Sequence, residues 1–548
     1  MLDHTAIGNS PEGAPCGVPV RVDPDQVDVV SAATGSEFPR TLPKALVFHL
    51  RRKLHPGSSR QFREANSSRP PAATVFRAAA TQSPGTPPYS HARFGAILRK
   101  ETQIGSMAAP TPVRNLLGSA RAVAERTPAD RNRYVDFLRA VSILAVVLGH
   151  WLVITPWVSA DGVFHGDHLL TRSEPARWLT WLFQVMPVFF AVGGYANAAS
   201  WDGAVERGTP YGQWLAGRLR RLVLPALPLF ALWAGIAVAT WSGMMGPMLV
   251  EVGSLGALSP LWFLAVYVAV VALVPLTRKA WLRFGVWSLW APVLATILVD
   301  ATAFGFGVTW LRWINYAFVW PAVHQIGYLW RDGRLGGVRS SAPYAIGGVI
   351  AALVAVLALD YPVAMIGVPD AGVSNSAPPT VALLALGIGQ VGILLAAERP
   401  MRRWLARVGP WTATVLVNGM IMTLFVWHYT VMVVPVIASA AWLDGTGLRL
   451  EPDTGLWWAT RPLWIAALAL ILAVFAPLVG RFERPGRRDP ASAGKVRPMA
   501  GAMLACAGFA VPALVGVSVT PDLSWVALAL PAVGMVVAGA MGTSRGTP

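Results

Sequence analysis

The stretch DFLRAVSILAVVLGHW, residues 136–151, decides how this chain folds. Between Arg139 and His150 it contains only Ala, Val, Ile, Leu, Gly and one Ser, which predicts the first part of a membrane-spanning helix. At about 100° per residue, the eleven steps from Arg139 to His150 return both side chains to nearly one face, roughly 16 Å apart along the axis. Because an ionisable side chain within a span is costly, we expect both residues to be functional.

The composition is that of a protein with many membrane spans. Of the 548 residues, 54% are hydrophobic and 13% are charged, against about 25% charged in soluble domains. The formal net charge of +17 comes from basic residues in short loops and in the N-terminal arm, which favours membrane topology over nucleic-acid binding. Cys16 and Cys506 are too few for a metal site or a disulfide framework, so we expect no metal and no permanently bound cofactor.

Apolar runs of spanning length recur along the rest of the chain. They lie at about 136–156, 177–199, 222–242, 260–277, 284–303, 310–330, 343–366, 379–397, 411–440, 459–480, 499–520 and 523–541. Only helices and closed barrels satisfy the backbone in lipid, and continuous runs of about 20 residues indicate helices. The sequence therefore predicts an all-α polytopic membrane bundle with ten core helices and two further C-terminal helices.

Basic residues gather in alternate loops between these runs. The loops before the third run and after the fourth, sixth and eighth carry Arg or Lys, whereas the loops between them are acidic or neutral. By the positive-inside rule, the N-terminal arm and Arg139 lie on the cytoplasmic side, and we expect the plasma membrane as the location. The segment FHGDHLLTRSEPAR, residues 164–177, is then expected to be a wet loop on the outer side.

The chain divides into four parts by composition. Residues 1–106 are rich in Pro, Ser, Arg and Ala and are expected to be disordered, with Met107 as a candidate for the true start of translation. Residues 107–135 form a cytoplasmic juxtamembrane segment, residues 136–485 the main membrane domain, and residues 486–548 a linker followed by an extra transmembrane hairpin.

Three histidines fall within predicted spans: His150, His324 and His428. A lone histidine in a bundle is more often hydrogen-bonded to a neighbouring helix than catalytic, so His324 and His428 are secondary candidates. Asp136 and Arg139 continue the polar face that carries His150, which makes Asp136 a further catalytic candidate. The alternative for Asp136 is a plain helix-surface ion pair with Arg139, at a spacing of i, i+3.

The segment that carries this polar face is the first of seven motifs along the chain. They are VDFLRAVSILAVVLGHW, MPVFFAVGGYANAAS, GRLRRLVLPALPLFALW, PLWFLAVYV, INYAFVWPAVHQIGYLW, FVWHYT and FERP. Together these motifs resemble those of the acyltransferase-3 family of integral membrane acyltransferases, whose first span carries Arg or Lys, ten residues and then His. The resemblance covers about 136–485. The chain departs from the family's pattern at Gly193 and Gly194, where Ser-Gly is common.

The resemblance implies an O-acyltransferase that moves an acyl group, expected to be acetyl, from acyl-CoA to a hydroxyl of a carbohydrate or glycolipid. Neutral imidazole, with a pKa near 6.5, suits removal of the hydroxyl proton, so His150 is the implied base. Arg139 would anchor the donor or orient the histidine. Direct transfer and an acyl-histidine intermediate both remain open. We expect no attached hydrolase-type domain, so that the core would act alone or with a separate periplasmic or extracellular partner.

The donor's phosphates require cationic groups, and guanidinium binds phosphate with paired hydrogen bonds. By the resemblance, Arg218, Arg220 and Arg221 are candidates for this role, and Trp262 would line the central cavity. Ordinary positive-inside charge is the alternative for the arginines, and an interfacial position is the alternative for Trp262.

Two other classes of protein remain open at this point. A secondary transporter or flippase for an amphiphilic or sugar-bearing solute would also carry apolar runs broken by proline. Pro187, Pro225, Pro228 and Pro321 interrupt runs here, but they do not fall in two matching halves. The third class is a structural protein that presents its Arg-rich loops to a partner.

Overall fold

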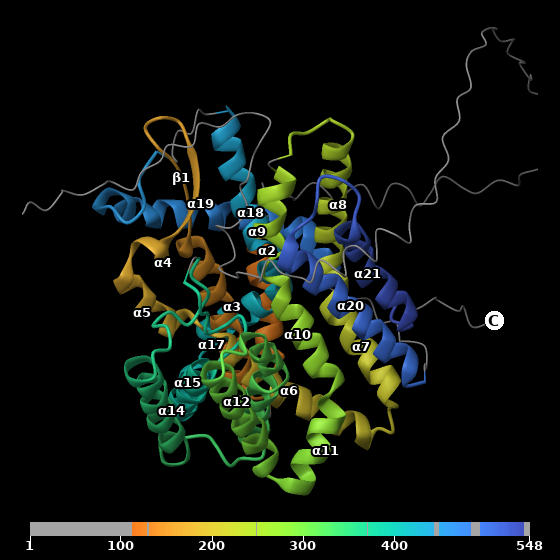
Figure 1. Ribbon diagram of the computed structural model, residues 1–548. Helices are drawn as coiled ribbons and strands as arrows, with labels where there is room; N and C mark the ends of the chain where they lie inside the picture. The colour runs from red at the N-terminus through yellow and green to blue at the C-terminus, as the bar shows by residue number, and fades with distance from the viewer. Residues whose placement is uncertain are drawn as a thin grey trace, which may run out of the picture. The chain divides into compact units, whose positions relative to one another are not determined.

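The computed structural model describes residues 112–128, 131–247, 249–369, 371–442, 449–483 and 494–541 (Figure 1). They form two compact units, a core unit of residues 138–399 and 420–541 and a smaller unit of residues 112–137 and 400–419. The arm predicted to be disordered, Met107 and the predicted linker at 486–493 lie outside the described residues.

Nearly all regular structure in the described residues is helical. The first helices are α2 (Pro112–Glu125), α3 (Arg133–Val153), α4 (Leu169–Arg172), α5 (Glu174–Phe183), α6 (Met186–Glu206), α7 (Tyr211–Val223), α8 (Leu227–Trp241), α9 (Ser254–Leu258), α10 (Leu261–Ala272), α11 (Val274–Phe284) and α12 (Trp287–Gly305). They continue with α13 (Val319–Arg331), α14 (Val338–Ala358), α15 (Val381–Ala396), α16 (Glu398–Trp404), α17 (Val408–Asn418), α18 (Ile421–Trp442), α19 (Gly455–Val479), α20 (Val496–Val515) and α21 (Leu523–Val537). Short 3-10 and π segments are η1 (Leu224–Ala226), η2 (Leu249–Gly253), η3 (Thr309–Ala317) and η4 (Gly480–Glu483).

The prediction of a polytopic helical bundle is confirmed. Among the described residues, eight helices or joined helices are long and apolar enough to cross a membrane, and ten if each of two interrupted pairs counts as one span. The interrupted pairs are α15 with α16 and α17 with α18, and the C-terminal α21 is a shorter apolar helix. Twelve uninterrupted spans, as the apolar runs predicted, are therefore not present in the described chain.

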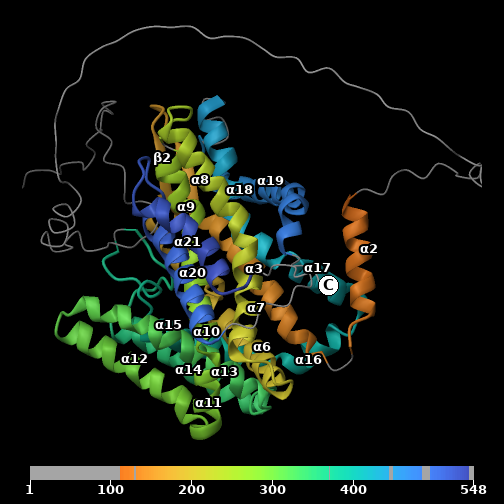
Figure 2. The same cartoon turned by 90° about the vertical axis from the view of Figure 1, so that its right-hand side faces the viewer.

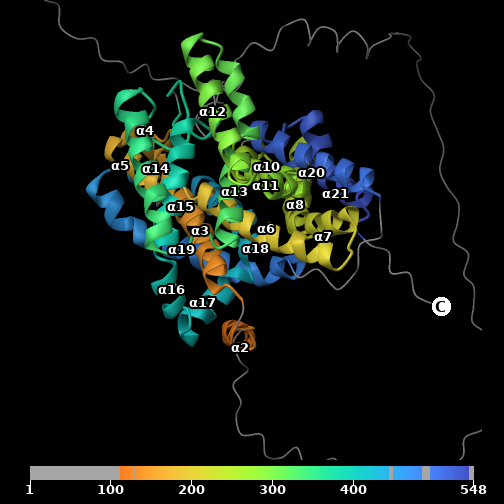
Figure 3. The same ribbon diagram turned by 90° about the horizontal axis from the view of Figure 1, so that it is seen from below.

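The core unit is arranged in layers that can be followed in two views. Helices α6, α10 and α13 lie in the middle, with α14 and α15 on one side and α20 and α21 on the other (Figures 1 and 3). Figure 2 shows the last pair lying along α8 and α10. The two C-terminal helices thus belong to the core unit and pack against its central helices.

The predicted span at 310–330 is wrong as a continuous helix. Its first half is the 3-10 segment η3, and only α13 is α-helical. The reason is a set of hydrogen bonds made by buried polar side chains of this segment. Asn315 donates to Asp300 Oδ1 at 2.8 Å and to the carbonyl of Pro379 at 3.0 Å, and Arg312 donates to the carbonyl of Ser374 at 2.7 Å. These buried side chains bind the loop that precedes α15, and the backbone leaves the α-helical path to bring them there.

The expected wet loop after α3 is a structured β-hairpin. Strand β1 (Ile154–Val158) pairs antiparallel with β2 (Phe164–His168), and Ile154 lies opposite His168. Leu169 and Leu170, which follow the hairpin, are buried in one apolar cluster with Trp457 of α19. The segment before α15 also contributes to this cluster. This segment is therefore a folded element that is buried around His168, Leu169 and Leu170 and exposed at the tip of the hairpin.

The smaller unit accounts for Asp136. Its carboxylate binds Arg131, with Nε to Oδ2 at 2.6 Å, so the suggested ion pair between Asp136 and Arg139 is not formed. In the same unit, Trp411 donates to Thr127 at 3.1 Å and Arg133 donates to the carbonyl of Leu405 at 3.1 Å. The i, i+3 spacing predicted Arg139 as the partner of Asp136, but the actual partner is Arg131, which lies just before α3.

Two glycines allow α6 and α13 to cross in close contact. A Cβ at Gly194 would overlap the backbone carbonyl oxygen of His324, and a Cβ at Gly327 would overlap that of Ala191. Small residues let membrane helices approach this closely. A Cβ at Gly193 would also lie 2.8 Å from the hydroxyl of Tyr267. The glycine pair that departs from the family's pattern is therefore accommodated by its packing.

We predict that Gly194→Ala destabilises the protein, because the added methyl must push α13 away from α6. Overpacking of this kind costs about 1–3 kcal/mol, enough to lower the melting temperature of the detergent-solubilised protein by several degrees. Gly235→Ala in α8 is the matched control, since a Cβ there meets no atom within 4 Å. Equal melting temperatures for the two variants would contradict the close crossing.

Candidate active site

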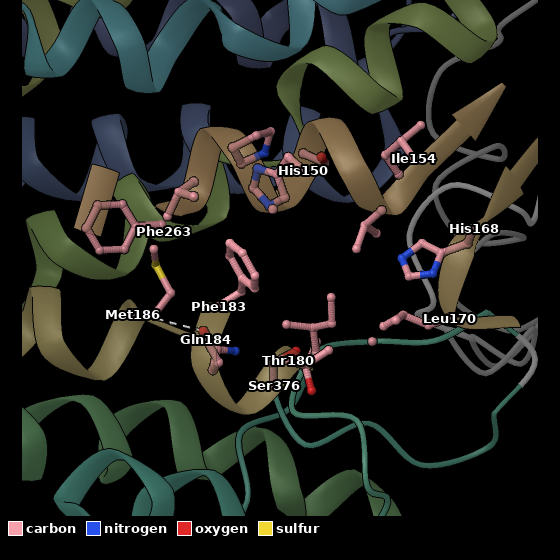
Figure 4. A pocket seen from close by; sticks show the side chains of 18 of the residues that line it. His150, Ile154, His168, Leu170, Thr180, Phe183, Gln184, Met186, Phe263 and Ser376 are labelled. Carbon is pink, nitrogen blue, oxygen red and sulfur yellow. Dashed lines mark hydrogen bonds between the residues drawn. The ribbon is translucent and has the colours of Figure 1, made fainter. Parts of the chain in front are cut away.

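A cavity of about 270 Å³ lies in the core unit beside His150 (Figure 4). Its walls come from α3, the β-hairpin, α5, η3, α18 and the loop before α15. The lining includes Ala145, Gly149, His150, Ile154, His168, Leu170, Thr180, Phe183, Gln184, Met186, Ser259, Trp262, Phe263, Trp313, Tyr316, Ser376, Tyr429, Trp458, Ala513 and Leu514. No Asp, Glu, Lys or Arg of the described chain lines it, so the cavity suits an uncharged group.

His150 and His428 form a direct pair at the edge of this cavity. Nδ1 of His150 lies 2.8 Å from Nε2 of His428, and the two rings stack with their centroids 5.1 Å apart. Trp151 donates to the backbone carbonyl of His428 at 3.0 Å, which fixes α3 against α18 a second time. The ring of Tyr429 lies 4.7 Å from that of His150. The pair joins residues 278 positions apart in the chain.

The hydrogen bonds of His428 determine where the protons lie. Its Nδ1 is 2.8 Å from the carbonyl oxygen of Phe425 and 3.2 Å from that of Leu424. A carbonyl can only accept, so Nδ1 of His428 carries a hydrogen and, in the neutral ring, Nε2 is the acceptor. His150 then donates from Nδ1, which leaves the lone pair on its Nε2. A neutral His150 is thereby held in the tautomer whose basic nitrogen is Nε2.

A carboxylate positions the helix that carries His428. Glu483 of η4 accepts from the backbone N–H of Met422 at 2.9 Å, and from the N–H and hydroxyl of Thr423 at 3.1 and 2.7 Å. These groups lie in the first turn of α18, where N–H groups lack helical partners and negative charge is favoured. Glu483 belongs to the FERP motif, so the motif's acidic residue fixes the start of α18.

Arg139 does not share the cavity with His150. The lining of α3 runs from Ala145 to Val153, and Arg139 lies outside it. Helical periodicity predicts that both side chains look into the same place; of the two, only His150 lines this cavity, and the catalytic role of Arg139 stays a prediction. Arg139 is half-buried, and its positive charge acts on Arg218 of α7 together with that of Arg221. The structure thus brings Arg139 to the basic stretch of α7.

Arg218 reaches a second buried polar cluster. Its guanidinium donates to the side-chain oxygen of Asn197 in α6. The amide nitrogen of Asn197 lies 3.1 Å from Nε2 of His324 and 3.3 Å from the hydroxyl of Tyr267. His324 is thus hydrogen-bonded to a neighbouring helix, as favoured for it from the sequence. Among the described residues, no carboxylate forms an ion pair with Arg139, Arg218 or Arg221.

Of the remaining candidates, Trp262 lines the cavity and stands 5.8 Å from the ring of Trp320. Arg220 is half-buried in α7. A search of the described residues for three or more metal-binding side chains finds no such group. Ala513 and Leu514, at the end of α20, also line the cavity, which the sequence did not indicate.

Comparison with known proteins identifies the fold's family. A family model described as an acyltransferase domain, that of the acyltransferase-3 family, matches residues 132–480, more than half of the chain. The chain belongs to the acyltransferase-3 family. It is therefore a multi-pass membrane enzyme that transfers acyl groups, which confirms the resemblance. No curated protein and no solved structure matches it.

Two features of the site could not be predicted from the sequence: the pairing of His150 with His428 and the position of His168. The pairing of His150 with His428 depends on the packing of α3 against α18, and the motif FVWHYT was the one signal that could have indicated it. The contribution of His168 depends on the β-hairpin, for which the apolar runs carry no signal.

We predict that Glu483→Gln destabilises this acyltransferase by about 1–2 kcal/mol, because an amide cannot accept all three hydrogen bonds at the start of α18. Thermal unfolding in detergent measures the effect. Glu451→Gln is the control, since Glu451 is exposed and its ion pair among the described residues is the surface pair with Arg172. A control variant as unstable as Glu483→Gln would argue against this role of Glu483.

Proposed function

We propose that this enzyme is an O-acyltransferase that moves an acyl group, acetyl in the simplest case, from acyl-CoA to a hydroxyl of a carbohydrate or glycolipid. We further propose that it works in the plasma membrane with its N-terminus in the cytoplasm, as the distribution of basic loops predicts. The observation that carries the proposal is the histidine pair, in which the hydrogen bond to His428 leaves a lone pair on Nε2 of His150, beside an uncharged cavity.

In the proposed reaction, Nε2 of His150 takes the proton of the acceptor hydroxyl while the hydroxyl oxygen attacks the carbonyl carbon of the thioester. The carbon–sulfur bond breaks, the acyl group is transferred, and the proton passes from His150 to the departing thiolate. General-base catalysis of this kind contributes about 10²–10⁴-fold to rates. His428 supports the step by accepting from Nδ1, which keeps the basic nitrogen directed away from the pair. An acyl-histidine intermediate would use the same lone pair.

The arginines support an anionic donor. The charges of Arg139 and Arg221 both act on Arg218, and none of the three arginines forms an ion pair with a carboxylate of the described chain. Clustered guanidinium groups without carboxylate partners repel one another and favour a bound polyanion. The phosphates of CoA have the required charge. Trp262, which lines the cavity, would contact the pantetheine or acyl part of the donor.

We predict that His150→Ala lowers acyl incorporation from radiolabelled acetyl-CoA into membranes at least about 100-fold, because the base is removed. His428→Leu should lower it about 10- to 100-fold, because Nδ1 of His150 loses its acceptor and the ring is free to change tautomer. The measurement is labelled product in membranes that contain equal amounts of each variant.

The control is Trp427→Phe, since Trp427 precedes His428 on α18 but packs against Phe475 of α19, at 4.9 Å between ring centroids. Its incorporation should match that of the wild type. Full incorporation by His150→Ala would rule out the imidazole as the base, and a wild-type protein that transfers no acyl group from any acyl-CoA would overturn the proposed function.

A second prediction concerns the donor. Arg221→Gln and Arg218→Gln should raise the KM for acetyl-CoA about tenfold, because each removes a charge-assisted contact to phosphate. The control is Arg283→Gln on α11, because Arg283 is exposed and stacks on Phe284. The KM of this variant for acetyl-CoA should equal that of the wild type. Equal effects of all three changes would indicate that only general positive charge matters.

A further inference from the structure

The β-hairpin presents one face to the cavity. Along a strand, side chains alternate between the two faces, and directly opposite residues point to the same side. Ile154 and His168 are opposite partners in the register, and both line the cavity. Figure 4 shows His168 across the cavity from His150, with Ile154 above the space between them. The hairpin therefore supplies the cavity with a second imidazole.

The other face of the hairpin explains why His168 is held in place. Trp157 donates to Asp167 at 2.8 Å, and Asp167 forms an ion pair with Arg172 at 2.6 Å. Arg172 also binds Glu451 before α19 at 3.0 Å. These contacts fix the strand that carries Asp167, so its neighbour His168 must point to the opposite face, into the protein.

The imidazole of His168 has a buried nitrogen, Nδ1, without a hydrogen-bond partner in the described part of the chain. Its side chain is buried, with 7% of the residue exposed, and its Nδ1 makes no hydrogen bond there. Burial lowers the pKa of His168 to about 4, so the ring is neutral at physiological pH and offers one donor and one acceptor. A buried polar group without partners costs free energy, and a bound ligand that supplies the partners recovers it.

We propose that His168 binds the acceptor, by hydrogen-bonding a second hydroxyl of an uncharged polyol, such as a sugar ring, whose reacting hydroxyl lies at His150. The proposal rests on the proposed function. Two neutral imidazoles at separate positions in one cavity suit a molecule with two hydroxyl groups on one frame. The aromatic rings of Trp313, Tyr316 and Trp458 line the space around it, as the apolar faces of a sugar require.

His168 is accordingly a specificity-determining residue, because it contacts the acceptor away from the bond that forms. Its loss should weaken transfer to the acceptor while leaving the reaction of the donor with water intact. This difference separates it from His150, whose loss should stop both reactions.

The test compares His168→Leu and His168→Gln with His165→Leu, a change on the same strand whose side chain stacks on Trp157 at the other face. Two rates are measured. The first is incorporation of label from radiolabelled acetyl-CoA into the glycan and glycolipid extract of membranes that contain each variant. The second is release of CoA from acetyl-CoA by the purified protein without acceptor, which also reports intact folding.

We expect His168→Leu to lower incorporation about tenfold or more at unchanged CoA release, because it removes hydrogen bonds to the acceptor. His168→Gln, which keeps a donor and an acceptor, should retain more incorporation, and His165→Leu should match the wild type. Incorporation by His168→Leu equal to that by His165→Leu overturns the proposal. Equal loss of both rates in both His168 variants also overturns it, since the residue would then be structural. Absence of label with the wild-type protein overturns the proposed function instead.

Discussion

The hydrogen bond between His150 and His428 is the interaction on which the rest of the site depends. In an apolar interior each polar group needs a partner, and these two rings satisfy one another only if α3 and α18 lie side by side. The carbonyl of Phe425 sets the protons of the pair, and Glu483 sets the start of α18. A carboxylate at one end of a helix thus contributes to the protonation of an imidazole on another helix.

A second constraint is the close crossing of α6 and α13. The glycines at the crossing leave no room for side chains, which brings Asn197 within reach of His324 and Arg218. The close backbone contact between α6 and α13 therefore brings the polar side chains of this cluster together. The arginines that this cluster holds are separate from the cavity, so the protein keeps its charged groups and its uncharged cavity in different places.

The sequence predicted what depends on composition and local pattern. The apolar runs predicted the helical bundle, and the ordered motifs predicted the acyltransferase-3 family, both of which are confirmed. It did not predict contacts that depend on tertiary packing. Periodicity placed Arg139 with His150, yet only His150 lines the cavity, and Asp136 binds Arg131 instead of Arg139. The hairpin was missed because β1 continues the apolar run of α3, whereas the sequence of β2 is that of a polar loop.

The end of α20 gives the cavity a wall that lies outside the family region. The family model ends at residue 480, whereas Ala513 and Leu514 contact the same space as His150. Part of the cavity's wall is thus encoded outside the stretch that carries the histidines. Such a division lets selection remodel the space around a substrate through an appended pair of helices, with the histidines left untouched.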